Sequence, residues 1–313
     1  MRKIETYICM IFMLVTAVTL YLWVIVGNKN TKEVTDFTYN SGELDDVINN
    51  YNEKTLDFFL DTYDSNILVS PISVQNTFYN YNIENNTEDS NIMKCLDFNY
   101  KSWKESSKLF NYDCLDNIFV NENTSSSDII NAQISNKLDN KDIEVFEDSD
   151  IKSDSIISLF NLGITVDKNY NVSKKKIKIW GTLDYAETDD FICYRIPINE
   201  GKYYFYTIEF KDETNRVLDN FNDLSWSREK VLLSIPNIKM NVCGKPINIL
   251  NLYRDDWSDY FDNILCSNSL YVKGSKQTYD NNLKYKRVTL NNITYIISSR
   301  DTGQFLAFGN IKL

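Results

Sequence analysis

The 313 residues of this chain include no histidine. Carboxylates and lysines are therefore the main side chains that could take part in acid–base chemistry. Without histidine the chain has no His-based catalytic triad, no histidine general base and no His-containing metal site. No nucleophile has a recognisable base partner, and no GxSxG motif is present. We therefore expect a protein that is not an enzyme, with no catalytic residue, no metal, no cofactor and no small-molecule substrate.

Paired carboxylates are the remaining route to acid–base chemistry. Three adjacent pairs occur, Asp45-Asp46, Asp189-Asp190 and Asp255-Asp256. In a chain this acidic, neighbouring carboxylates are far more often solvated surface groups or helix caps than a catalytic acid and base. We interpret all three pairs as surface features.

The charge balance argues against a nucleic-acid partner. The chain carries 33 Lys+Arg against 44 Asp+Glu, a formal net charge of -11, and nucleic-acid binding needs clustered positive charge to release counterions. The one basic run in the sequence is Lys174-Lys175-Lys176-Ile177-Lys178. It is typical of a solvated strand, and contact with an anionic surface is the alternative.

An unbroken apolar run from Tyr7 to Gly27 has no charged residue and, at about 21 residues, is long enough to cross a bilayer as a helix. A cleaved signal peptide would have a shorter apolar region ending in a small-x-small site, whereas this run ends in Trp23-Val24-Ile25-Val26-Gly27. A buried core helix is the third interpretation. We expect an uncleaved signal anchor, which divides the chain into a short tail (1–6), a transmembrane segment (7–27), a juxtamembrane stalk (28–42) and one domain (43–313).

The membrane orientation of this run is less clear from the charged residues on either side of it. Arg2 and Lys3 precede the run and Lys29 and Lys32 follow it, so the positive-inside rule nearly ties. We expect a single-pass type II membrane protein with a lumenal or extracellular domain, and a secreted protein if the run is cleaved. Four N-x-S/T sites fit possible glycosylation, although chance supplies as many in so Asn-rich a chain: Asn85, Asn123, Asn171 and Asn292.

Six cysteines add little chemistry. Cys9 lies in the apolar run, and the five others form no CxxC pair, so zinc and thioredoxin-like sites have no support. We expect buried free thiols, with one or two disulfides as the alternative if the domain is lumenal.

The elements that must position any site begin with helices. From Glu43 to Phe59, apolar residues recur at three- and four-residue spacing, which makes one face of a helix. A short apolar run, Asn66 to Val69, then meets Ser70-Pro71, a good helix cap followed by a good first helical residue. This pattern predicts a strand that leads directly into a helix over 72–81.

The remainder is mostly β. Residues 155–166 are apolar enough for a central strand buried on both faces, and the turns at Asn199–Lys202 and Arg300–Gly303 predict hairpins. Further strands are expected at 115–120, 191–196, 203–210, 231–240, 293–299 and 304–313, with a helical patch at 248–261. Helices followed by strands indicate an α+β domain built on antiparallel sheets.

The stretch Asn66 to Ser73 (NILVSPIS) resembles the serpin family, whose members enter a long helix from a buried strand through an SP-x-S turn. Four further stretches agree in the same order with the family's GNTxxQIxxxL, G-x-F-x-YAE, V-x-x-x-LPKFK and TGxILFxGRV motifs: Asn86–Leu96, Gly181–Glu187, Val231–Met240 and Thr302–Ile311. The resemblance spans roughly residues 43–313. It implies a serpin-like α+β fold of antiparallel sheets, with helices mostly in the N-terminal half, preceded here by one transmembrane helix.

The departures from the family bear on function. Inhibitory serpins carry a small-residue hinge and a long exposed reactive loop that is cleaved and inserts as a new strand in the central sheet. Here Leu270-Tyr271-Val272 resembles the start of the strand before the hinge, yet no run of small residues follows. Eight residues separate Tyr279 from Val288, spanning at most about 26 Å. This shortened reactive-loop region holds groups whose insertion would bury unpaired charge: Asp280, Lys284, Tyr285, Lys286 and Arg287.

The resemblance also implies a shutter, a cluster of Ser and Asn beneath the opening of the central sheet. Ser70, Ser73 and Asn161 match those positions, while Lys276 or Gln277 stands where the family has its shutter His.

We therefore expect a membrane-anchored serpin-like protein that has lost the inhibitory hinge and reactive loop and acts through protein–protein binding. One alternative is a serine or cysteine protease inhibitor with a shortened loop, using Arg287 or Lys286 as bait. Another is an unrelated viral membrane glycoprotein whose motif matches are chance. The excess of Asn, Ile, Lys, Tyr and Asp is typical of an AT-rich genome, and with a shortened serpin it resembles poxvirus genes, so we expect a host or viral protein as the partner.

Overall fold

The computed structural model describes residues 41–62, 66–85, 110–120, 126–137, 146–147, 149–152, 155–212, 216–218, 221–244, 264–276 and 284–312. The chain divides into two units, Met1–Leu44 and Asp45–Leu313, and nearly all the described residues belong to the second. The predicted tail, the apolar run 7–27 and most of the predicted stalk lie outside the described residues. In the part of the chain that is described, no helix is both long enough and apolar enough to span a bilayer.

The described α-helices come early in the chain, as the sequence predicts. They are α2 (Ser41–Thr62), α3 (Pro71–Asn85) and α6 (Ser127–Lys137), and a short 3-10 turn, η3, follows at Phe221–Asp223. Strand β1 (Ile67–Val69) leads directly into α3, because Pro71 fixes a helical φ angle and lacks the amide hydrogen that would be left unpaired there. The predicted helical patch at 248–261 lies outside the described residues.

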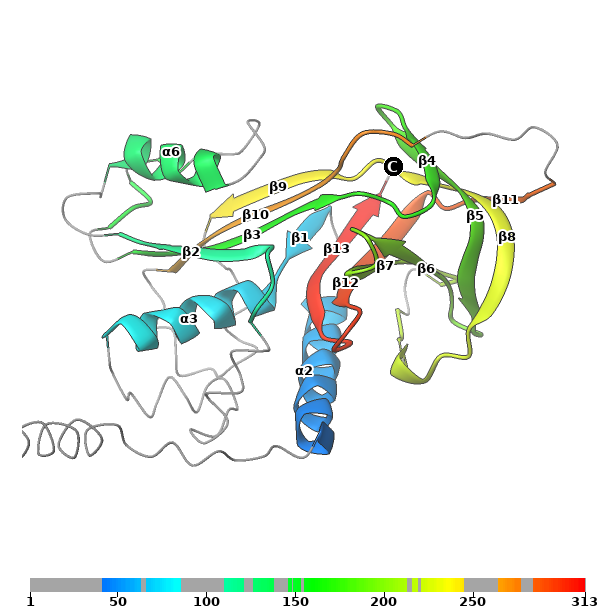
Figure 1. The fold of residues 1–313 in the computed structure, drawn as a ribbon, viewed down its shortest axis with the longest axis horizontal. Helices are drawn as coiled ribbons and strands as arrows, with labels where there is room; N and C mark the ends of the chain where they lie inside the picture. The colour runs from blue at the N-terminus through cyan, green and yellow to red at the C-terminus, as the bar shows by residue number, and fades with distance from the viewer. Residues whose placement is uncertain are drawn as a thin grey trace, which may run out of the picture. The chain divides into compact units, whose positions relative to one another are not determined.

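A large sheet joins the early strand β1 to most of the later part of the chain (Figure 1). Its strand order is β1-β13-β12-β7-β6-β5-β8-β11, and β4 pairs with β5 beside this path. The members after β1 are β4 (Asn169–Val172), β5 (Lys176–Glu187), β6 (Phe191–Ile198), β7 (Tyr203–Phe210), β8 (Ser227–Pro236), β11 (Lys286–Thr289), β12 (Asn292–Ser299) and β13 (Phe305–Lys312).

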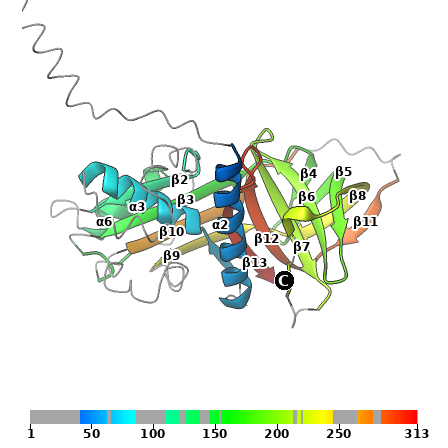
Figure 2. The ribbon, with the colours of Figure 1, turned by 90° about the horizontal axis from the view of Figure 1, so that it is seen from below.

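A second, four-stranded sheet has the order β2-β3-β10-β9. Its strands are β2 (Leu115–Phe119), β3 (Ile156–Ile164), β9 (Lys239–Gly244) and β10 (Ile264–Val272). Figures 1 and 2 show α3 on one face of this sheet and α6 on the other. Both faces are therefore covered, which explains why β3 is so uniformly apolar.

The expectation of antiparallel sheets is confirmed only in part, because most strand pairs are antiparallel but each sheet contains one parallel pair. β3 pairs with β10 in parallel, and so does β8 with β11. Parallel neighbours need a long crossover, and about a hundred residues separate β3 from β10. The one strand predicted at 231–240 is also two strands, because β8 ends at Pro236 in the large sheet and β9 begins at Lys239 in the small one.

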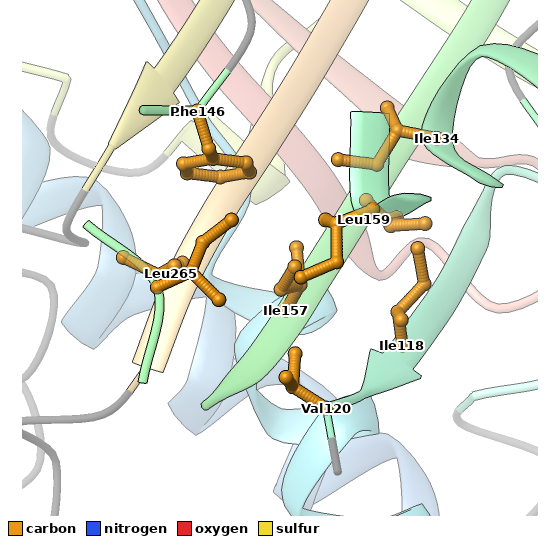
Figure 3. Close-up of a cluster of buried hydrophobic side chains, with 9 residues drawn as sticks. Ile118, Val120, Ile134, Phe146, Ile157, Leu159 and Leu265 are labelled. Atoms are coloured by element: carbon orange, nitrogen blue, oxygen red, sulfur yellow. The ribbon is translucent and has the colours of Figure 1, made fainter. Parts of the chain in front are cut away.

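The core of the small sheet on its α6 side is a cluster of nine buried hydrophobic side chains, most of them labelled in Figure 3. Ile130 and Ile134 come from α6, and Ile157 and Leu159 from β3. Removing this much apolar surface from water, at roughly 1.5–3 kcal/mol per fully buried side chain, is what holds α6 on the sheet. The remaining members are Ile118, Val120, Phe146, Ile151 and Leu265.

Helix α2 is joined to the turn between β12 and β13. The Asn52 side chain donates from Nδ2 to the Gly303 carbonyl at 3.1 Å and accepts at Oδ1 from the Phe305 amide at 2.9 Å. Phe59 stacks on Phe308 with ring centroids 5.5 Å apart. One buried amide therefore satisfies two backbone groups of a sharp turn, which fixes the helix relative to the hairpin.

The described cysteines are free thiols. Cys114, Cys193 and Cys266 are buried and Cys243 is partly buried. Burial is the main cause that raises the pKa of Cys114 and of Cys266 to about 12. These thiols are therefore protonated at neutral pH and act as small core residues.

We predict that Ile157→Ala lowers the free energy of unfolding by about 2–5 kcal/mol, because it opens a cavity in the α6 cluster. Ile157 is 0% exposed. The matched control is Ile129→Ala on α6, where the side chain is 42% exposed and little changes on truncation. Urea unfolding of both variants measures the difference, and equal losses would contradict the packing described here.

Candidate functional site: the seam between β3 and β10

The seam between β3 and β10 is the central contact of the small sheet. The two strands run parallel and pair along their whole length, from Ile156 opposite Ile264 to Ile164 opposite Val272. The amide of Lys273 extends the ladder by donating to the Ile164 carbonyl at 2.7 Å. Any strand entering between β3 and β10 would first have to break this continuous backbone ladder.

On the α6 side of the seam, the side chains change from apolar to polar along the two strands. Ile157, Leu159 and Leu265 lie in the apolar cluster at the start of the two strands. Side chains alternate between faces along a strand, so Asn161 follows on this same face, directly opposite Ser269. Ser269 donates from Oγ to Asn241 Oδ1 on β9 at 2.8 Å. The second half of the seam on this side is therefore polar.

The α3 side of the seam also holds polar groups. By the same alternation, Ser158 and Phe160 face α3, and Asn268 lies directly opposite Phe160. Asn268 Oδ1 and Gln75 Oε1 of α3 are buried without a hydrogen-bond partner among the described residues, whereas Ser158 lies directly opposite the Cys266 thiol. A buried polar atom without a partner destabilises the folded state, here with β3 and β10 paired, by about 1–3 kcal/mol.

Ser70 and Ser73, the first two predicted shutter residues, lie together at the junction of β1 and α3. Both are buried. Ser70 Oγ donates to the Leu306 carbonyl of β13 at 2.7 Å, and Ser73 Oγ donates to the Ser70 carbonyl at 2.7 Å. The Ser70 hydroxyl therefore connects the helix start to the large sheet, in addition to any role in ending the strand.

Asn161, the third predicted shutter residue, is placed apart from that pair. It lies on the α6 face of β3, whereas Ser158 and Asn268 occupy the face toward α3. These two residues are the ones that sequence reasoning missed. The signal was present as polar residues inside two apolar strands, but their facing is set by the register and is not readable from one strand alone.

The segment that leaves β10 is pinned at its start. Tyr170 of β4 exchanges two backbone hydrogen bonds with Lys276, its amide donating at 2.8 Å and its carbonyl accepting at 3.1 Å. The Tyr170 hydroxyl donates to the Lys273 carbonyl, and burial raises the pKa of this phenol, which keeps its proton. Ser275 Oγ accepts from the Val172 amide at 3.2 Å. Residues 273–276 are thus held against β4.

The same segment is fixed again at its far end. Lys286 and Arg287, predicted in the shortened reactive loop, lie in β11, whose backbone pairs in parallel with β8. Lys286 Nζ lies 2.7 Å from Glu229 Oε1, and Glu229 Oε2 accepts from the Tyr194 hydroxyl at 2.9 Å. Lys284 and Tyr285 precede the strand, with Lys230 Nζ 5.5 Å from the centre of the Tyr285 ring.

The connection between β10 and β11 therefore comprises residues 273–285 and is longer than the eight residues counted from the sequence. Asp280 lies outside the described residues. Of the four predicted glycosylation sites, Asn171 lies in β4 and Asn292 begins β12, both partly exposed. Asn85 is the last residue of α3, and Asn123 lies outside the described residues.

Comparison with known proteins places the fold. No protein-family model and no curated protein sequence matches the chain. Many solved structures do match it, and three of them illustrate the likeness. Native protease nexin-1 with heparin has a TM-score of 0.64 at 10% identity, covering 88% of this chain and 100% of that one. A serpin from the trematode Schistosoma haematobium has a TM-score of 0.64 at 11% identity, covering 86% and 98%.

Maspin, solved at 3.10 Å, has a TM-score of 0.61 at 15% identity, covering 87% of this chain and 99% of that one. Identities this low show the fold alone. The chain therefore has a serpin-like fold, with mixed sheets, and the alternative that the five motif matches are chance loses its support.

We predict that Ser70→Ala lowers the free energy of unfolding by about 1–3 kcal/mol, because it leaves the buried Leu306 carbonyl without its donor. The matched control is Ser227→Ala. Ser227 Oγ also donates to a backbone carbonyl, that of Tyr185 at 3.2 Å, but it is exposed and water replaces the bond. Denaturant unfolding measures both variants. A Ser70→Ala protein as stable as the Ser227→Ala protein would contradict the assigned hydrogen bond.

Proposed function

We propose that this chain is a membrane-tethered serpin-like protein that does not inhibit proteases by loop insertion and acts by binding another protein. It is proposed as a binding protein and not as an enzyme. The observation that carries the proposal is the state of the segment between β10 and β11, which is fixed at both ends and has the wrong composition to become a central strand.

Length alone does not prevent insertion. Residues 277–285 lie beyond the contact with Tyr170, and they are as numerous as the 9 residues of β3. A nicked segment of this length reaches along the whole seam at about 3.3 Å per residue. Any barrier to insertion must therefore lie in the side chains of the segment.

Composition opposes insertion, because one face of the inserted strand would be polar and charged. In an inserted strand, Thr278, Asp280, Asn282 and Lys284 would alternate onto one face. α3 lies on one face of the small sheet, and α6 covers the other face where β3 and β10 begin. Burying Asp280 or Lys284 without a partner would destabilise the product by several kcal/mol each, which offsets the new backbone hydrogen bonds.

The alternative function, a protease inhibitor with a shortened reactive loop, has little structural support. Arg287, its candidate bait residue, is exposed, but its backbone lies in β11 opposite Leu232 of β8. A protease needs the bait segment as an extended strand free to enter its own active site. Arg287 would have to leave a sheet before it was recognised.

The partner is proposed from composition. The Asn- and Ile-rich, shortened serpin-like chain resembles poxvirus proteins, so we propose a host defence protein or another viral membrane protein as the partner. The apolar run 7–27 would hold the domain at a membrane, where crosslinking followed by mass spectrometry identifies what it contacts.

We predict that cutting one bond between Asp280 and Arg287 leaves the melting temperature within about 5 °C of the intact chain, because no strand inserts and about 1 kcal/mol corresponds to only ~2–4 °C in a domain of this size. The full-length chain in non-ionic detergent is nicked, the site is checked by mass spectrometry, and thermal unfolding is followed by circular dichroism. A large rise in the melting temperature on nicking would show that the segment inserts into the sheet, and it would overturn the proposal.

The control for this experiment changes composition and nothing else. In the variant Asp280→Ala/Asn282→Thr/Lys284→Ala the charged face of the segment becomes small and neutral. If composition is what prevents insertion, nicking this variant raises the melting temperature while nicking the parent does not.

We further predict that incubation with serine and cysteine proteases yields only cleaved chain and no covalent, SDS-resistant complex, because trapping requires insertion. Denaturing gels read the result. A resistant complex that disappears in Arg287→Ala would establish the inhibitor with a shortened loop instead.

A further inference from the structure

A basic pocket of about 310 Å³ lies over the strands β5, β6, β7 and β8 of the large sheet. Four cationic side chains line it, Lys168, Arg195, Arg228 and Arg300, against the single carboxylate of Asp184. The excess of three positive charges stands out in a chain whose formal net charge is -11. A concave site lined by one sign of charge concentrates its field on anions.

The sheet register creates the centre of this pocket. Asp184 of β5 lies directly opposite Arg195 of β6 and directly opposite Arg228 of β8, so the three form a row across adjacent strands. Arg195 donates from Nε and Nη2 to Asp184 Oδ2 at 3.1 and 2.9 Å. The Arg228 Nε atom lies 3.8 Å from Asp184 Oδ1. Asp184 therefore compensates Arg195 first and leaves most of the charge of Arg228 available.

Arg195 is held rigidly in this row. Its guanidinium carbon lies 4.4 Å from the centre of the Trp226 ring and 4.9 Å from that of Tyr204. Burial alone lowers the pKa of Arg195, but the hydrogen bonds that Arg195 donates to Asp184 outweigh it and raise the pKa above its usual value. Arg195 is a fixed charge, and a fixed charge loses little side-chain entropy when an anion binds.

Lys168 and Arg300 supply the charge that is not compensated. They come from the loop between β3 and β4 and from the turn after β12, and within the described part of the chain neither has a carboxylate partner. Arg300 is positioned by its amide, which donates to the Lys202 carbonyl at 3.0 Å, and by the Tyr204 ring, whose centre lies 5.8 Å from its guanidinium carbon. Both cations are at least partly open to solvent and can pair with an anion that enters the hollow.

The apolar part of the lining indicates what carries the anion. Pro197 and Tyr204 contribute apolar walls, and the two lie directly opposite each other across β6 and β7. The volume is near the lower limit of small-molecule sites, which begin at roughly 300 Å³. It suits a tetrahedral oxyanion together with one small ring, and arginine forks match such an oxyanion with paired hydrogen bonds.

We propose that this pocket binds a sulfate or phosphate ester carried on a sugar ring, with Lys168, Arg228 and Arg300 contacting the oxyanion. The ester comes either from a free sugar ester or from a sulfated polysaccharide chain. The run Lys174–Lys178, which is the basic feature visible in the sequence, is not part of this pocket. The proposal is independent of whether the β10–β11 segment inserts.

Isothermal titration calorimetry on the full-length chain in non-ionic detergent at low salt tests the site. The probes are glucose 6-sulfate, glucose 6-phosphate, unsubstituted glucose and a heparin octasaccharide. We expect the charged probes to bind and glucose not to bind. Tighter binding of the octasaccharide than of both monosaccharide esters identifies the polysaccharide as the source, and comparable binding identifies the free ester.

The variants decide whether the pocket is responsible. Lys168→Gln/Arg300→Gln removes two pocket charges and should weaken binding roughly 10-fold or more, because charge-assisted hydrogen bonds are lost. Lys174→Gln/Lys175→Gln removes the same charge from exposed positions outside the pocket and should change affinity less than roughly 3-fold. Equal weakening in both variants, or no binding by the parent chain, overturns the proposal. Circular dichroism confirms that each variant remains folded.

Discussion

The parallel ladder between β3 and β10 is the interaction on which the rest of the small sheet depends. It brings together two strands that are far apart in the chain, and it gives α3 and α6 their opposite faces to cover. The amide of Lys273 continues it into the segment that Tyr170 then holds. The ladder therefore links the state of the sheet to the state of the segment, because neither can rearrange without releasing the other.

Much of this architecture could be predicted from local pattern. Ser70-Pro71 defines the step from β1 into α3, and the uniform apolarity around Leu159 identifies β3 as a strand covered on both faces. Register is different in kind. Whether Asn161 or Ser158 faces α3 depends on which residue of β10 lies opposite each of them, and a shift of one position reverses the answer.

The two basic features of the chain show the same limit for sites. Lys174, Lys175 and Lys178 are close in sequence and easy to find, yet they are exposed and line no pocket described here. Lys168, Arg195, Arg228 and Arg300 come from four separate segments that only the fold brings to one pocket, with the pairing of β5 with β6 and β8 aligning Arg195 and Arg228. Tyr170 is a similar case, since the residues next to it in the sequence do not predict its backbone pairing with Lys276.

The hairpin β12–β13 lies between β1 and β7 in the large sheet, and this has a consequence for biosynthesis. The hydroxyl of Ser70 has no acceptor until Leu306, 236 residues later in the chain, has been synthesised. At translation rates of roughly 5–20 residues per second, the early helices spend about 10–50 s without the strands that complete their packing. During that interval the apolar faces of these helices are exposed, so the yield of folded protein depends on how well the ribosome and chaperones shield them.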